Sequence, residues 1–182
     1  MSKNVIFCYS GSGNCLDFAK NVAKGLGDTD IIMMRKTPVK TDVRDAERVG
    51  FIVPCYGGGL PGDVESFLGS IRISPDAYTF AVGQYAGYGL HKIDKQFKLD
   101  LWTGLSHQCS CIWLFPHQLM LPPVTPKMAQ KRSERMAKRL VKSILAGEKS
   151  KKAPPKMGLN ALESKVWPKL AVGKAKKFAV TD

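Results

Sequence analysis

Small polar residues between positions 10 and 15 have the composition of a phosphate-binding loop. The loop reads Ser-Gly-Ser-Gly-Asn-Cys and joins an apolar run to a stretch with helical spacing. Glycines let the backbone turn its N–H groups inward, and hydroxyl and amide side chains add further donors. A helix that begins here favours an anion by roughly 0.3–1 kcal/mol, and each charge-assisted hydrogen bond adds roughly 1.5–3 kcal/mol. The loop therefore predicts a site for a single phosphate.

Single residues exclude other phosphate chemistries at this loop. A nucleoside-triphosphate loop needs Gly-Lys-Ser or Gly-Lys-Thr, which is absent. The dinucleotide fingerprint needs glycine or alanine where Leu16 stands. A cysteine phosphatase needs arginine six residues after its nucleophile, but Asn14 lies six residues after Cys8. A tight strand-to-helix turn without a ligand stays open as the alternative.

Two later loops combine glycine with tyrosine. Residues 54–61 read Pro-Cys-Tyr-Gly-Gly-Gly-Leu-Pro, and residues 83–89 read Gly-Gln-Tyr-Ala-Gly-Tyr-Gly. Aromatic side chains on such loops can stack on a flat ring, which contributes roughly 0.5–1.5 kcal/mol beyond the area buried. Half-buried packing is the alternative interpretation of these tyrosines.

Five apolar runs and four helical patterns must position these loops. Strands are predicted near residues 3–9, 30–34, 49–53, 78–82 and 109–115, and helices near residues 16–26, 63–69, 89–101 and 126–146. Strands that alternate with helices predict an α/β fold, an open parallel sheet with helices on both faces. Ligands bind such sheets at the carboxyl ends of the strands. All three loops follow predicted strands.

The loop motifs resemble those of the flavodoxins. They are most similar to the flavodoxin half of bacterial and archaeal flavodoxin–ferredoxin fusion proteins, over roughly residues 3–146. The shared pattern is Tyr-Ser-Gly-Ser-Gly-Asn at a strand end, then Pro-x-Tyr with a later proline, then Gly-x-x-x-Gly. This resemblance implies a flavodoxin-like sheet ordered 2-1-3-4-5, a domain over residues 1–147 that binds flavin mononucleotide (FMN), and a basic extension or linker over residues 148–182.

The resemblance also implies the residues of the flavin site. The flavin phosphate would be bound by Ser10, Gly11, Ser12, Gly13, Asn14 and Cys15. The isoalloxazine ring would be lined by Pro54, Cys55, Tyr56, Gly57, Gly58, Gly83, Gln84, Tyr85, Gly87 and Tyr88. The chain departs from the pattern at Cys15, where the family usually has serine or threonine, and in its basic charge.

Positive charge is concentrated in the last third of the chain. The formal net charge is +13, of which residues 121–182 carry +12 and residues 1–120 only +1. Lysines and arginines of the helix predicted near residues 126–146 lie opposite its apolar stripe. A solvated helix face is one interpretation, and a docking surface for an acidic redox protein of the ferredoxin type is another. Nucleic acid is not expected as a partner, because no recognition motif accompanies the charge.

Composition excludes several protein classes. Of 182 residues, 44% are hydrophobic and 24% charged, as in ordinary globular proteins. No apolar run is long enough to span a membrane, and the N-terminus lacks a signal-peptide pattern. The five cysteines are scattered without a C-x-x-C motif, so we expect no disulfide framework and no metal site. A reducing cytoplasm is the expected location.

The residues predict a redox carrier without catalytic side chains of its own. His91 is interpreted as a helix-surface residue, and His107 and His117 show no partner spacing for catalysis. We expect transfer of one or two electrons through bound FMN, with an iron–sulfur protein or domain as partner. Two alternatives stay open: an FMN-dependent NAD(P)H or quinone reductase, and a basic interaction module without flavin.

Overall fold

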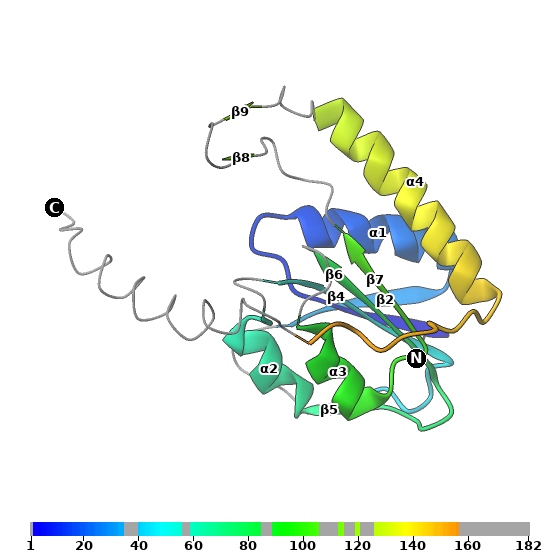
Figure 1. The fold of residues 1–182 in the computed structure, drawn as a ribbon. Coiled ribbons are helices and arrows are strands. Elements are labelled where there is room, and N and C mark those ends of the chain that lie inside the picture. The colour runs from blue at the N-terminus through cyan, green and yellow to red at the C-terminus, as the bar shows by residue number, and fades with distance from the viewer. Residues whose placement is uncertain are drawn as a thin grey trace, which may run out of the picture.

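Five parallel strands form the central sheet of the protein, seen here in a computed structural model (Figure 1). The structure describes residues 2–34, 40–55, 59–84, 89–105, 113–114, 119–120 and 126–156. The sheet order is β2-β1-β4-β6-β7, with β1 Asn4–Cys8, β2 Thr29–Met33, β4 Arg48–Pro54, β6 Tyr78–Gln84 and β7 Leu101–Leu105. Counted along the chain, these strands have the predicted order 2-1-3-4-5, so the flavodoxin-like fold is confirmed.

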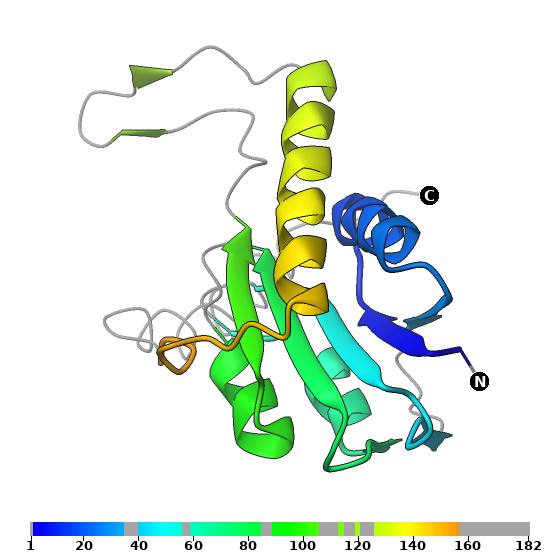
Figure 2. The same cartoon turned by 90° about the vertical axis from the view of Figure 1, so that its right-hand side faces the viewer.

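Helices cover both faces of the sheet. Helices α1 (Asn14–Leu26) and α4 (Pro126–Leu145) lie on one face, and α2 (Gly62–Leu68) and α3 (Leu90–Phe97) lie on the other (Figures 1 and 2). The core is therefore split into two layers, and neighbouring residues of β1 contribute to different layers. Phe7 packs on the α2 side, whereas Ile6 packs on the α1 side. Burial on both faces explains why the strands are continuous apolar runs.

Four short strands lie outside this sheet. β3 (Thr41–Asp42) pairs in parallel with β5 (Ile71–Arg72), and β8 (Trp113–Leu114) pairs antiparallel with β9 (Leu119–Met120). Among the described residues, no helix is long and apolar enough to cross a membrane.

The fifth strand of the sheet differs from the predicted one. The sequence predicts the fifth strand at Cys109–Phe115. In the structure, β7 (Leu101–Leu105) is the fifth strand of the sheet, and it pairs with β6 from Phe80↔Leu101 to Gln84↔Leu105. Within the predicted run, the structure describes only Trp113–Leu114, which pairs with β9 instead. The prediction for this strand was therefore wrong.

The early end of α3 explains the shift. Lys98 adopts a left-handed conformation (φ 52°), and this change of backbone direction ends the helix. The Lys98 N–H still donates to the Asp94 carbonyl at 2.8 Å. Asp100 then joins the sheet, because its N–H donates to the Thr79 carbonyl at 2.8 Å and its carboxylate accepts the Thr79 N–H at 2.9 Å. The apolar spacing that continues to Leu101 predicts a longer helix, but Leu101 is the first residue of the strand.

Residues 148–156 run back across the outer edge of β7 (Figure 2). The Ser150 N–H donates to the Asp100 carbonyl at 2.7 Å, and Trp102 Nε1 donates to the Lys152 carbonyl at 2.6 Å. The Tyr78 hydroxyl donates to the Glu148 carbonyl at 2.5 Å. The Trp102 N–H donates to Ser150 Oγ at 3.0 Å, which satisfies a backbone group of the edge strand β7. Free backbone groups at such an edge would otherwise invite pairing with other chains.

Candidate flavin site

Three adjacent strands bring the predicted loops to one edge of the sheet. β1, β4 and β6 are neighbours, and their register places Cys8 opposite Ile52 and Pro54 opposite Gln84. The first loop follows β1, the second follows β4 and the third follows β6, all at the carboxyl ends. This is the place where open α/β sheets bind their ligands.

The first loop leaves the N-terminus of α1 without a side-chain cap. Gly13 is the residue before the helix, with a left-handed φ of 87°, and no described side chain caps the first turn. The helix is nevertheless regular from its start, because the Asp17 N–H bonds to the Gly13 carbonyl at 2.9 Å. Gly11, Ser12 and Gly13 are exposed, and Asn14 is half-buried. The backbone N–H groups of this turn are thus placed to bind an anion.

A buried hydroxyl at the base of this loop supplies a second, independent feature. Ser10 Oγ is buried and has no hydrogen-bond partner among the described atoms. Leaving such a group unsatisfied costs about 1–3 kcal/mol. A phosphate oxygen would accept its hydrogen bond, so the donors present here fit the phosphate of a nucleotide.

Cys15 connects the first loop to the third. Its thiol is buried and donates to Gln84 Oε1 at 3.0 Å. The Gln84 carbonyl in turn accepts the Cys55 N–H at 3.0 Å, at the base of the second loop. The Cys15 side chain thus holds the first and third loops together, and the contact of Cys15 with a phosphate stays a prediction. Gln84 is the residue at which all three loops meet.

Three buried, uncharged thiols lie at the bases of the loops. The pKa of each of Cys8, Cys15 and Cys55 is raised to about 12, by burial for Cys8 and Cys55, and by burial together with the nearby Cys8 and Cys55 for Cys15. All three are therefore neutral at physiological pH. Within the described part of the chain, no group of three or more His, Cys, Asp or Glu residues is arranged to hold a metal ion.

The second and third loops approach each other closely at Gly89. This residue precedes α3 with a left-handed φ of 96°, and a Cβ added to it would lie 2.9 Å from the Gly59 carbonyl carbon. Only glycine fits this contact without moving the backbone. The backbone of Gly89 therefore fixes the distance between the two loops.

Four of the residues predicted to line the ring are described by the structure, and they lie at the strand ends. Pro54, Cys55, Gly83 and Gln84 are buried at the bases of the second and third loops. The remaining predicted ring contacts lie outside the described residues and stay predictions: Tyr56, Gly57, Gly58, Tyr85, Gly87 and Tyr88.

Comparisons with models of known families and with curated protein sequences give no match. Among solved structures, the chain is similar to flavodoxin 1 from Bacillus cereus, with 16% identity, 78% of this chain and 98% of that chain covered, and a TM-score of 0.47. A Fusobacterium nucleatum flavodoxin bound to FMN gives 10% identity, 79% and 99% coverage, and a TM-score of 0.48.

A rubredoxin:oxygen oxidoreductase from Desulfovibrio gigas gives 13% identity and a TM-score of 0.49. The match covers 81% of this chain but only 37% of that protein. At such low identity these likenesses concern the fold alone. The chemistry of the site therefore has to come from the chain's own residues.

His91, interpreted from the sequence as a helix-surface residue, lies directly after the third loop. It follows Leu90 at the start of α3, and its Nδ1 is buried without a partner among the described atoms. Burial lowers its pKa most strongly, and Lys92 and Lys156 lower it further, so the imidazole is neutral at physiological pH.

Proposed function

We propose that this protein binds FMN and carries electrons in the manner of a flavodoxin. The observation that carries the proposal is the unsatisfied Ser10 hydroxyl beside the uncapped first turn of α1, at the edge where β1, β4 and β6 end. Several donors converge on one anion, and the chain has no motif for a second phosphate. A flavin mononucleotide fits this arrangement better than a dinucleotide.

Each part of the chain has a separate task in this function. The Ser10 hydroxyl and the first-turn N–H groups of α1 bind the phosphate, and Gln84 keeps the three loops at fixed positions. Tyr56, Tyr85 and Tyr88 flank the ring and limit its contact with water. Bound FMN supplies the capacity to accept and release one or two electrons. The neutral thiols below the loops add no charge to the site.

The proposed partner is an acidic iron–sulfur protein of the ferredoxin type in the cytoplasm. Helix α4 supports this, because all seven of its cations are exposed and Glu134 is its single acidic residue. The cations are Lys127, Lys131, Arg132, Arg135, Lys138, Arg139 and Lys142. Complementary charge speeds the encounter of two redox proteins and orients them.

Visible absorption of the purified protein tests the proposal. We expect the protein to be purified with flavin, or to take up FMN when the apo-protein is reconstituted, and then to be reduced by a reduced ferredoxin. A protein that stays colourless after reconstitution would contradict it. Catalytic oxidation of NAD(P)H with a quinone would instead identify a reductase, which is the other enzyme class open to this fold.

A further inference from the structure

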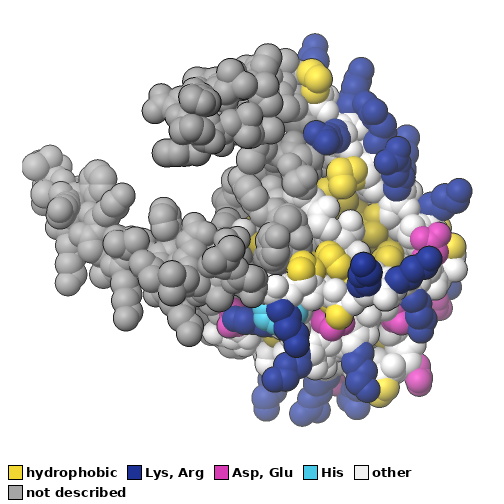
Figure 3. Space-filling model, viewed as in Figure 1, with side chains coloured by type: hydrophobic (Ala, Val, Ile, Leu, Met, Phe, Trp, Pro, Cys, Tyr) yellow, Lys and Arg dark blue, Asp and Glu magenta, His cyan; other side chains and the backbone are white. Residues whose placement is uncertain are grey.

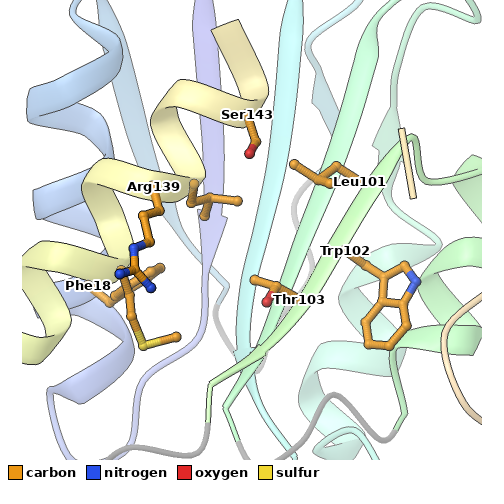
Figure 4. A pocket seen from close by; sticks show the side chains of 8 residues that line it. Phe18, Leu101, Trp102, Thr103, Arg139 and Ser143 are labelled. Carbon is orange, nitrogen blue, oxygen red and sulfur yellow. The ribbon is translucent and has the colours of Figure 1, made fainter. Parts of the chain in front are cut away.

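A groove separate from the flavin loops opens between α4 and the edge of the sheet (Figure 4). Its volume is about 340 Å³, within the range of about 300–1,000 Å³ typical of ligand pockets. Phe18 and Leu140 are buried and form its floor. Leu101, Thr103, Met136 and Ser143 are half-buried along its walls.

The groove has apolar walls and one charged residue. Leu101 and Thr103 point from β7 toward α4, whereas the Trp102 ring lies on the other side of the strand (Figure 4). Arg139 is exposed and extends from α4 over the groove. Such a site suits a bulky apolar side chain that is accompanied by a carboxylate.

Cations continue from Arg139 along the exposed surface of α4. Figure 3 shows lysine and arginine side chains along this helix beside apolar surface. Among the described residues, no cation of α4 lies within 4.0 Å of a carboxylate, whereas Lys92 and Lys149 elsewhere on the surface each do. The helix thus presents positive charge that the described part of the chain does not neutralise.

We propose that this groove docks an acidic segment of the redox partner, which inserts an apolar side chain between α4 and β7 and pairs a carboxylate with Arg139. The inference rests on the proposed function only for the partner being an iron–sulfur protein. Binding at the groove itself does not require flavin.

Charge complementarity places the occupant outside this chain. Residues 106–125 contain no Lys, Arg, Asp or Glu, so they offer no carboxylate to α4. Residues 157–182 contain five lysines against Glu163 and Asp182, so their net charge has the same sign as that of the helix. A separate acidic protein would complement both the apolar walls of the groove and the cations of α4.

The position of the groove suits electron transfer. Phe18 on its floor follows Asn14 of the phosphate loop by four residues of α1, which is about 6 Å along the helix axis. A partner segment seated in the groove would thus lie beside the helix that begins at the flavin phosphate.

Affinity for an acidic ferredoxin with two [4Fe–4S] clusters, measured by calorimetry at moderate salt, tests the proposal. Thr103→Trp and Ser143→Trp fill the groove without a change of net charge, and each should weaken binding at least about tenfold. Arg139→Glu should do the same, whereas the matched Lys138→Glu, exposed on the same helix but outside the groove, should cost less than about threefold. Thermal melting checks that each variant folds.

Several results would overturn the docking site. Unchanged affinity in both groove-filling variants, or equal losses for Arg139→Glu and Lys138→Glu, would reduce α4 to a general cationic surface. Tighter binding of a short single-stranded RNA than of the ferredoxin would show that the partner is a nucleic acid and not an acidic protein.

A photo-crosslinking benzoylphenylalanine at position 142, which is exposed on α4 beside the groove but does not line it, identifies the occupant directly. Crosslinks to an acidic segment of the ferredoxin support the proposal, and crosslinks to residues 106–125 or 157–182 of the same chain overturn it. All measurements use both apo-protein and protein incubated with FMN. Ferredoxin binding without FMN binding would refute the flavin function alone, and FMN binding without ferredoxin binding would refute the docking groove alone.

Discussion

Ser10 and Gly13 contribute to the first loop in different ways. Gly13 adopts the left-handed backbone that uncovers the first turn of α1, and it has no side chain that could cap this turn itself. Ser10 adds a buried hydroxyl that the described protein atoms leave unsatisfied. A capping serine at position 13 would compete with a ligand for the same N–H groups, so the glycine keeps them available.

Loss of the side-chain donors should weaken FMN selectively. Ser12→Ala combined with Asn14→Ala should lower FMN affinity by roughly 3–6 kcal/mol if both bonds to phosphate are charge-assisted. Riboflavin lacks the phosphate and serves as the control in the same fluorescence titration. An equal loss for riboflavin would show that the loop is structural.

At the scale of the elements, the contact between the second and third loops depends on a single backbone approach. Gly89→Ala would bring a Cβ to 2.9 Å from the Gly59 carbonyl carbon at a φ of 96°. We expect the free energy of unfolding to fall by about 1–3 kcal/mol, and FMN binding to weaken because the loops separate.

Gly62→Ala is the matched control for this substitution. No atom lies within 4 Å of a Cβ added at Gly62, which is the first residue of α2. Its effect in a urea titration should stay below about 1 kcal/mol. Similar losses for the two variants would show that the approach at Gly89 has no special importance.

The hydrogen bond from the Tyr78 hydroxyl to the segment that crosses β7 makes the free energy of unfolding depend on pH in the alkaline range. Burial, followed by the neighbouring Asp100 and Glu148 carboxylates, raises the pKa of Tyr78 to about 12. Because the folded pKa lies above the unfolded value of about 10, the stabilisation is complete below about pH 10 and is lost as the pH rises toward 12.

Removal of this hydroxyl tests the pH dependence. The difference in unfolding free energy between the wild type and Tyr78→Phe should stay constant up to about pH 10 and narrow from there toward pH 12, as measured by urea titration at each pH. A difference that stays constant across this range would contradict the role of Tyr78.

The elements also show where sequence patterns suffice and where they do not. Buried strands such as Val49–Val53 are read correctly, because burial on both faces makes them continuous apolar runs. The edge strand β7 contains Thr103 and Gly104 and lacks such a run, and its start depends on the left-handed turn at Lys98. No glycine or proline stands at this turn, so the sequence gives no local signal for it.

The candidate site likewise has features that a local sequence pattern can indicate and features that it cannot. The phosphate-binding role of residues 10–14 is a prediction from their types and from their place between a strand and a helix. The bond from Cys15 to Gln84 joins residues 69 positions apart, and no local pattern can predict such a contact. The groove beside α4 likewise depends on how a helix packs on a sheet.

The distribution of charge across the whole molecule separates the flavin site from the partner surface. Residues 1–120 hold all three loops and carry a net charge of +1, whereas residues 121–182 carry +12. Attraction between exposed charges is screened over about 8–10 Å at moderate salt. Changes on α4 should therefore act on the partner and leave the flavin largely unaffected.

Charge reversal on α4 tests this separation. Arg135→Glu, Arg139→Glu and Lys142→Glu together should slow electron transfer with an acidic ferredoxin at low salt, and the loss should shrink as salt rises. FMN affinity should stay within about 0.5 kcal/mol of the wild type, as for surface changes far from a site. Stopped-flow rates that match the wild type at low salt would leave α4 as a solvated face.

The measurement that tests the account most directly is a fluorescence titration of the apo-protein with three flavins. A cradle for one phosphate at the N-terminus of α1 predicts a 1:1 complex with FMN, and clearly weaker binding of both flavin adenine dinucleotide and riboflavin. Equal affinity for FMN and the dinucleotide, or for FMN and riboflavin, would contradict the central claim that the first loop binds the flavin phosphate.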